Sequence, residues 1–198
     1  QQTRKNGDLT VRVNLRPTMF EVNNVAALGI TRGFGDDWLE FVGYKAWVDG
    51  IMGSSGALFF QPYDHQPDNS GYLRDIMFPE SDDGWGMSMG INDKYTDRPP
   101  GNLEQLLEVA VDTGIPPHIH AIGDAAVRRT LDGYQAARTT NGDRDSRHRI
   151  EHIEIIDEAD IKRFAELGVI ASMQPLHALG TGSYPMEPTR SKIGDAKL

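Results

Sequence analysis

The sequence predicts an α/β fold built on a parallel β-sheet. Over residues 102–175, three helix-like segments alternate with three short strand-like segments. Strands that alternate with helices are typical of βαβ units, whose strands run parallel. The length of 198 residues is enough for one domain with a substantial core.

The helices of this alternating region are recognised by their apolar faces and their ends. Segment 102–114 has an apolar face and stops at a glycine. Asp124 and Asp157 are expected to cap the helices at 124–138 and 157–167. The intervening strands are predicted at 116–123, 148–153 and 169–175.

The first half of the chain is less regular. Residues 9–15 alternate apolar and polar side chains and 41–50 are rich in aromatic and β-branched residues, so both predict strands. Residues 19–30 predict a helix. Residues 51–101 form a long stretch rich in glycine, proline and aspartate. Loops of this length inside a domain are usually functional, so we expect a lid-like insertion.

The letters HRIEH at 148–152 allow two structures. In a helix, H-x-x-E-H is the signature of inverted zinc peptidases. In a strand, His148, Ile150 and His152 share one face and Glu151 faces the other way. We favour the strand because it keeps the helix–strand alternation of the neighbouring segments intact.

Two histidines stand at the carboxyl ends of predicted strands, where parallel sheets carry chemistry. His120 and His152 are 32 residues apart, about one βαβ unit, so we expect equivalent heights on neighbouring strands about 4.8 Å apart. Two such imidazoles can bind a metal through nitrogen and oxygen ligands. The alternative is that each is a hydrogen-bonded core or rim residue. His118 is the second choice as ligand, and His148, at the opposite end of its strand, is interpreted as structural.

Lys45 lies inside the strand predicted at 41–50 and shares its predicted face with Trp47 and Asp49. A buried lysine is costly unless it is paired or neutral. A Lys45–Asp49 ion pair is therefore the simple explanation. The alternative is that a neutral amine adds carbon dioxide and becomes an oxygen ligand for a metal.

Composition excludes several classes of protein. The net charge of −9 argues against nucleic-acid binding, which needs a basic surface. The chain has no cysteine, so disulfides and thiolate metal sites are excluded. No apolar run approaches the ~20 residues that span a bilayer. We therefore expect a small-molecule substrate, with neither nucleic acid nor membrane as partner.

Four segments occur in one order that resembles the amidohydrolase superfamily, in its amidohydrolase family 3 branch. They are KAWVDGIMGSSGALF (45–59), HAIGDAAVRRTLDGY (120–134), RHRIEHIE (147–154) and ELGVIASMQPLHA (166–178). The resemblance implies a (β/α)8 TIM barrel, of which residues 1–198 hold about strands three to seven. It also implies hydrolysis of carbon–nitrogen bonds, as in amides and formamides, by hydroxide activated on one or two divalent ions, with zinc as first choice.

On the family pattern the metal ligands are Lys45, in carboxylated form, His120 and His152. The first-strand His-x-His pair and the eighth-strand aspartate are missing from the sequence, and Gly56 replaces a threonine. We therefore expect the central segment of an enzyme. Its first and last strands would be edges that further residues, or a second copy in a homo-oligomer, would cover.

Candidate substrate-binding residues are Tyr63 and Trp85 in the insertion and His177 after the last strand. The main alternative function is a catalytically inactive regulatory protein on the same fold. A metal-free glycosidase would need paired carboxylates. The adjacent aspartates at 36–37 and 82–83 lie in polar stretches and are better explained as solvated turn residues.

Overall fold

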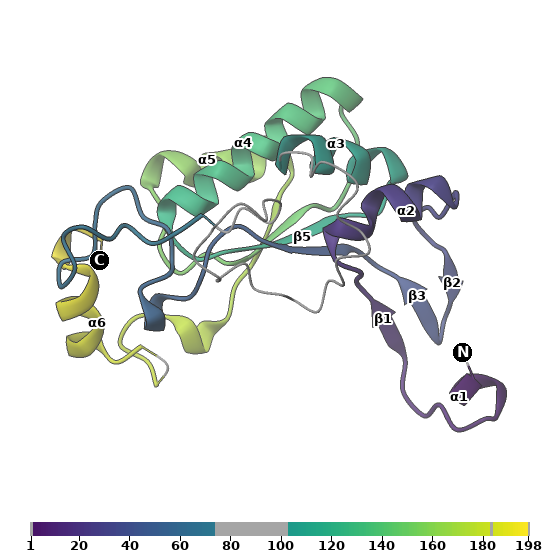
Figure 1. Cartoon of the computed structure of the whole chain (residues 1–198), viewed down its shortest axis with the longest axis horizontal. Helices are drawn as coiled ribbons and strands as arrows, with labels where there is room; N and C mark the ends of the chain where they lie inside the picture. Colours follow the sequence, from purple (N-terminus) through teal and green to yellow (C-terminus); the bar gives the residue numbers. More distant parts are fainter. Residues whose placement is uncertain (1, 74–102, 183, 198) are drawn as a thin grey trace, which may run out of the picture.

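The computed structural model describes residues 2–73, 103–182 and 184–197. Its centre is a parallel sheet in the order β4-β5-β6-β7, with helices α3, α4 and α5 across one face (Figure 1). The strands are β4 (Tyr44–Trp47), β5 (Pro117–Ala121), β6 (Arg149–His152) and β7 (Ile170–Ser172), and the helices are α3 (Leu103–Thr113), α4 (Asp124–Asn141) and α5 (Glu158–Leu167). The predicted α/β class with a parallel sheet is confirmed.

HRIEH forms a strand. Its residues 149–152 are β6, paired with β5 on one side and β7 on the other, so the zinc-peptidase interpretation is wrong. Ile150 is fully buried in the core beneath the helices. The preceding His148 stacks on Tyr134 of α4, with ring centroids 4.7 Å apart. His148 and Ile150 therefore face the helices.

The ends of the helices test the capping predictions. Asp157 caps α5 as predicted, because its carboxylate accepts a hydrogen bond from the Ala159 N–H at 2.8 Å. The prediction for Asp124 is wrong, since the N-cap of α4 is Gly123. A Cβ on Gly123 would lie 2.0 Å from the Leu58 carbonyl oxygen, so only glycine fits there. Asp124 is the first helical residue and accepts a hydrogen bond from the Phe60 N–H.

The strand predicted at 41–50 is two strands. Its start belongs to β3 in a small separate sheet ordered β1-β3-β2, and the chain joins the main sheet only at Tyr44. Gly43 makes this passage against the His118 ring, which a Cβ would meet at 2.5 Å. The strand predicted at 9–15 and the helix predicted at 19–30 are also shorter in the structure. The elements before β4 are α1 (Gln2–Lys5), β1 (Val13–Leu15), η1 (Met19–Glu21), α2 (Val22–Ala27), β2 (Gly35–Asp36) and β3 (Leu39–Phe41).

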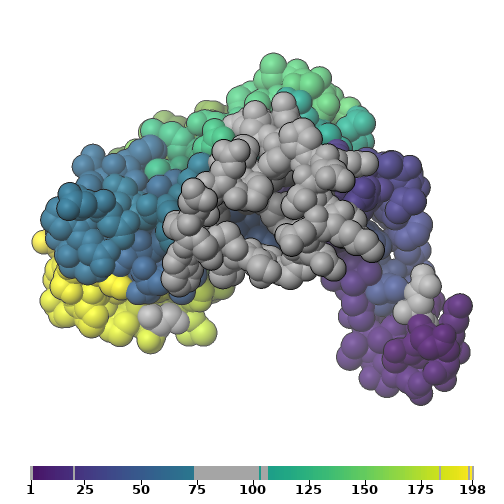
Figure 2. Space-filling model, viewed as in Figure 1, coloured from purple at the N-terminus to yellow at the C-terminus, as the bar shows by residue number. Residues whose placement is uncertain are grey.

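Two apolar cores hold the chain together. The larger lies between the main sheet and its helices and includes Tyr44, Ile119, Ile150 and Leu131. The smaller joins residues 52–63 to the C-terminal α6 (Met186–Ile193) through Tyr63 and Ile193. Figure 2 shows these two segments together at one end of the molecule, with the N-terminal residues at the other. The remaining elements are η2 (Met52–Ser54), η4 (Pro175–His177) and η5 (Asp195–Lys197).

The lid-like insertion stays a prediction. Its first part, to residue 73, packs through the smaller core, and its remainder lies outside the described residues. In the part of the chain that the structure describes, no helix combines the length and the apolar character needed to cross a membrane.

Gly43→Ala should destabilise the protein by about 1–3 kcal/mol, as overpacking does. The added methyl would overlap the His118 ring, and that side chain is only 1% exposed and cannot swing into solvent. Urea unfolding measures the effect. The control Gly53→Ala, where no atom lies within 4 Å of the new Cβ, should change stability by less than about 0.5 kcal/mol. Equal stabilities of the two variants would show that His118 can give way.

Candidate metal centre

The face of the sheet away from the helices carries a row of polar side chains. Lys45 pairs in register with His118, and Trp47 with His120. His120 in turn pairs with Glu151 of β6. Residues paired in register across parallel strands project to the same face. These five side chains therefore share the face opposite to the helices.

His152 reaches this face by a turn of the backbone. The predicted equal height with His120 is wrong, because His152 pairs with Ala121, whose side chain belongs to the helix-side core. The chain leaves the strand at His152 (φ 83°) and Ile153 (φ 52°), both in the left-handed region. The His152 ring consequently lies against the His120 ring, with centroids 4.6 Å apart. The two histidines meet, but the turn and not the strand pairing brings them together.

Lys45 forms an ion pair with Glu151, so the predicted pair with Asp49 is wrong. The alternation that turns Glu151 away from Ile150 directs it to the face of Lys45. Arg16 also approaches this carboxylate, at 3.5 Å. Burial alone would raise the pKa of Glu151, but the hydrogen bond and charge of Lys45, together with Arg16, outweigh burial and lower it. Carboxylation of Lys45 stays a prediction.

Asp49 organises the backbone around His120. Its fully buried carboxylate accepts hydrogen bonds from the N–H groups of Leu58 (2.9 Å), Ile122 (3.1 Å) and Gly123 (2.9 Å). The His120 Nε2 lies 3.3 Å from the same carboxylate and 3.2 Å from the Gly50 carbonyl oxygen. Both partners are acceptors here, so Nε2 carries a proton, and in the neutral ring the lone pair is on Nδ1.

Two further histidines are oriented in the same manner. His152 Nδ1 lies 2.9 Å from Gln174 Oε1, and His177 Nδ1 lies 2.8 Å from Glu154 Oε1. These oxygens accept, so Nδ1 of each ring carries a proton, and in the neutral ring the lone pair is on Nε2. Burial and the neighbouring His120 lower the pKa of His152, which favours the neutral ring. His177 stacks on His152 with centroids 5.9 Å apart.

These rings have the form of metal ligands. Metal-binding histidines typically donate one ring N–H to a carboxylate, carbonyl or other oxygen and offer the other nitrogen to the ion. His120, His152 and His177 all do so. One ligand atom from each of His152, Glu154 and His177 lies within 4.8 Å of the others. The donor set fits a divalent ion that prefers nitrogen and oxygen ligands.

Sequence reasoning missed Glu154 and the partnership of Glu151 with Lys45. A signal for Glu154 existed, since it stands two residues beyond His152 at the end of the strand, where ligands collect. No sequence signal indicated that His152 would turn out of the strand pattern.

The candidate substrate-binding residues have different surroundings. His177 lies beside His152 with 33% of its side chain exposed. Tyr63 is fully buried, and its hydroxyl donates to the Ala57 carbonyl at 3.0 Å. Trp85 lies outside the described residues. Substrate contact by these three residues stays a prediction.

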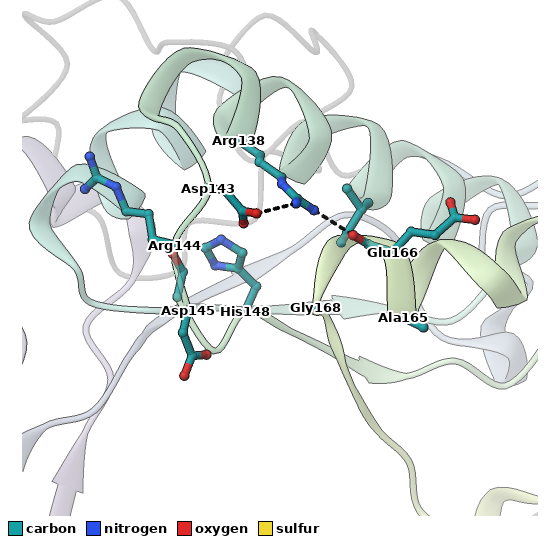
Figure 3. A pocket seen from close by; sticks show the side chains of 10 residues that line it. Arg138, Asp143, Arg144, Asp145, His148, Ala165, Glu166 and Gly168 are labelled. Atoms are coloured by element: carbon teal, nitrogen blue, oxygen red, sulfur yellow. Dashed lines mark hydrogen bonds and ion pairs between the residues drawn. The ribbon is translucent and has the colours of Figure 1, made fainter.

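A cavity of about 340 Å³ lies at the other end of the strands, near the start of β6 (Figure 3). Its charged groups serve the fold, because Arg138 bonds to Asp143 at 2.7 Å and to the Glu166 carbonyl at 2.6 Å. His148 lines this cavity, and burial lowers its pKa to about 4. Parallel sheets carry chemistry at the carboxyl ends of their strands. This geometry agrees with a structural role for His148.

Comparison with known proteins gives the family. Residues 1–192 match the amidohydrolase family. The chain belongs to amidohydrolase family 3. "Protein LONG AFTER FAR-RED 3" of Arabidopsis thaliana is 36% identical over 143 residues, or 72% of the chain. "Putative amidohydrolase YtcJ" of Bacillus subtilis (strain 168) is 26% identical over 138 residues, or 70% of the chain. The aligned region is 21% of each of these two proteins.

Two solved structures share the fold. One is an uncharacterized metal-dependent hydrolase from Pyrococcus furiosus, with a TM-score of 0.71 and 24% identity. The other is an uncharacterized metal-dependent hydrolase from Pyrococcus horikoshii OT3, with a TM-score of 0.68 and 24% identity. Both likenesses cover 99% of this chain, but 34% and 33% of the solved chains. The amidohydrolase segment described here thus corresponds to about a third of those structures.

His148→Phe should lose less stability than the wild type when the pH is lowered. The folded pKa of about 4 lies below the ordinary 6.5, so the unfolded chain takes up the proton first as pH falls. The resulting loss of folding stability is absent above about pH 6.5 and grows towards pH 4, reaching about 2 kcal/mol at pH 5. Phenylalanine keeps the stack on Tyr134 and removes the proton site. Urea unfolding at pH 7 and pH 5 measures the difference, and identical losses in both proteins would contradict the assignment.

Proposed function

We propose that this chain is part of a metal-dependent hydrolase that cleaves carbon–nitrogen bonds, such as those of amides or formamides, in a small molecule. The observation that carries the proposal is the contact of the His120 and His152 rings at the carboxyl ends of neighbouring strands, in a chain of amidohydrolase family 3. The names of the Pyrococcus proteins support it. In the whole protein we expect a closed (β/α)8 barrel.

The proposed centre holds one or two divalent ions, zinc as first choice, with Lys45, His120 and His152 among the ligands. A bound ion of this kind lowers the pKa of water and polarises the carbonyl that is attacked. The chain's own residues prepare the site. Asp49 and Gly50 hold the His120 ring so that Nδ1 is available, and Gln174 does the same for Nε2 of His152.

Lys45 has to leave Glu151 before it can serve as a carboxylated ligand, because carbon dioxide adds only to the neutral amine. Arg16 is close enough to keep the Glu151 carboxylate paired after this exchange. We assign substrate contact to His177 and keep Tyr63 and Trp85 as candidates. The exposed Ile170 and Met173 at the β7 edge would be covered by further residues or by a second copy of the chain.

An inactive regulatory protein is the second candidate. The observation that favours it is the Lys45–Glu151 pair, which occupies the amine that the family mechanism needs. Hydrolysis that depends on added metal, tested on a panel of amides and formamides, separates the two functions. A regulator of this kind would show no turnover at any metal concentration.

His120→Ala and His152→Ala should each weaken metal binding by at least about 100-fold, because even the loss of an outer partner of a ligand costs 10–100-fold. Hydrolysis by the complete protein should be lost with it. His148→Ala, at the other end of the strand, should retain its metal. Elemental analysis after dialysis measures occupancy. Equal losses in His148→Ala and His152→Ala would contradict the placement of the centre.

Lys45→Ala should lose activity that short carboxylic acids partly restore. A small carboxylate can occupy the space of the lost side chain and supply the oxygen that carboxylated Lys45 would give. Turnover with and without added acetate or propionate measures the rescue. Normal metal content without any rescue would indicate that Lys45 serves only as the ion-pair partner of Glu151.

A further inference from the structure

His177, to which substrate contact is assigned, is held by two residues that are not metal ligands of the proposed centre. Glu154 follows β6, and Tyr184 lies between η4 and α6, in the segment that follows β7. Since β6 and β7 are neighbours in the parallel sheet, both residues come from the carboxyl ends of adjacent strands. They therefore lie at the edge of the sheet that carries the centre.

The Glu154 carboxylate is buried and has a partner for each oxygen. Its side chain is 1% exposed. Oε1 accepts the Nδ1–H of His177 at 2.8 Å, and the Tyr184 hydroxyl is the partner of the other oxygen. Burial and the neighbouring carboxylate raise the pKa of the Tyr184 hydroxyl, so the hydroxyl keeps its proton and donates. A buried carboxylate held by two donors is a fixed acceptor for His177.

The plane of the His177 ring is also fixed. The ring stacks on His152 at an interplanar angle of 7°, with centroids 5.9 Å apart. It stands nearly perpendicular to the Tyr184 ring, at 88° and 5.8 Å. These contacts and the bond at Nδ1 restrict rotation of the imidazole, although 33% of the side chain is exposed.

The open group of this fixed ring is Nε2. It makes no hydrogen bond within the described residues and is not buried. Because Glu154 bonds to Nδ1, on the opposite side of the ring from Nε2, the carboxylate and Nε2 cannot bind one ion together. With the proton on Nδ1, Nε2 of the neutral ring is an acceptor. An acceptor held in one orientation selects ligands that donate a hydrogen bond to it.

We propose that Glu154 and Tyr184 are positioning residues, which hold His177 so that its Nε2 accepts a hydrogen bond from an N–H group of the substrate. The inference rests on the proposed function, because primary and secondary amides carry an N–H at the bond that is cleaved. His177 stacks on His152, which stays with His120 at the metal centre, so the bonded N–H is next to the attacked carbonyl. Tertiary amides, which lack this group, are bound more weakly.

¹⁵N-histidine spectra of the complete, zinc-loaded protein test the positioning without a substrate. At about pH 8.5, where an ordinary imidazole is neutral, His177 should show a protonated Nδ1 and an unprotonated Nε2. Glu154→Ala should replace this single tautomer by a mixture of both. Glu154→Gln should restore it, because the amide oxygen still accepts from Nδ1–H. The matched control is Glu158→Ala, at an exposed position in the first turn of α5, which should show the wild-type spectrum.

Two results of the spectra would overturn the proposal. One is a wild-type His177 ring with its proton on Nε2, or with protons on both nitrogens, and this result needs no variant that folds. The other is an unchanged tautomer in Glu154→Ala. The tautomer can also be measured in the metal-free protein, so a protein that binds no zinc would refute the proposed function separately from the positioning of His177.

Kinetics distinguish positioning from a general structural role. The probes are 4-nitroacetanilide and 4-nitroformanilide, whose amides carry an N–H, and their N-methyl derivatives. His177→Ala and Glu154→Ala should each raise KM for the N–H probes about 3- to 10-fold, the loss of one hydrogen bond, with little change in kcat. The double variant should be no worse than His177→Ala, because Glu154 acts through His177. Tyr184→Phe should raise KM less, since it leaves Glu154 one of its two partners.

The N-methyl probes test the hydrogen bond itself. N-methylation should raise KM of the wild type by a similar factor and should have little effect on KM of His177→Ala. Equal sensitivity of the two proteins to N-methylation would show that Nε2 does not bind the N–H. Additive effects of Glu154→Ala and His177→Ala would show that Glu154 does not act through His177. Absence of turnover with every probe would count against the proposed function, while the spectra still decide the positioning.

Discussion

The buried carboxylate of Asp49 is the constraint on which the rest of the site depends. It accepts hydrogen bonds from backbone N–H groups in the loop after β4 and in the turn after β5. Leu58 and Gly123 are therefore both bonded to the same carboxylate. Hydrogen bonds to a charged group contribute about 1.5–3 kcal/mol each, more than neutral ones. His120 Nε2 lies 3.3 Å from the same carboxylate and 3.2 Å from the Gly50 carbonyl oxygen, so Asp49 and its neighbour Gly50 together orient the ring.

From His120 the site extends along the carboxyl edge of the sheet. His152 joins it only because the backbone takes left-handed angles at His152 and Ile153, which cost about 1–3 kcal/mol per residue outside glycine. Such strain tends to persist at functional sites. Here it turns an imidazole out of the apolar helix side of the sheet and places it between His120 and His177.

Elements with strong local signals could be predicted. HRIEH could be predicted as a strand because the helices on either side of it have clear ends. Asp157 could be predicted as the cap of α5 because it bonds to the backbone two residues further along the chain. Elements set by contacts distant in sequence could not. The strand predicted at 41–50 is interrupted where Gly43 passes the His118 ring, and α4 is capped by Gly123, where the Leu58 carbonyl leaves no room for a Cβ. Neither contact leaves a trace in local composition.

The sequence by itself determined the family, the alternation of strands and helices, and the histidines at strand ends, since periodicity and motif order are local properties of the chain. The tertiary structure decided which side chains of the site contact each other. Lys45 meets Glu151 and not Asp49, because parallel register aligns residues that are far apart in sequence. Glu154 meets His177 because β6 and β7 end side by side, which only the assembled sheet can bring about.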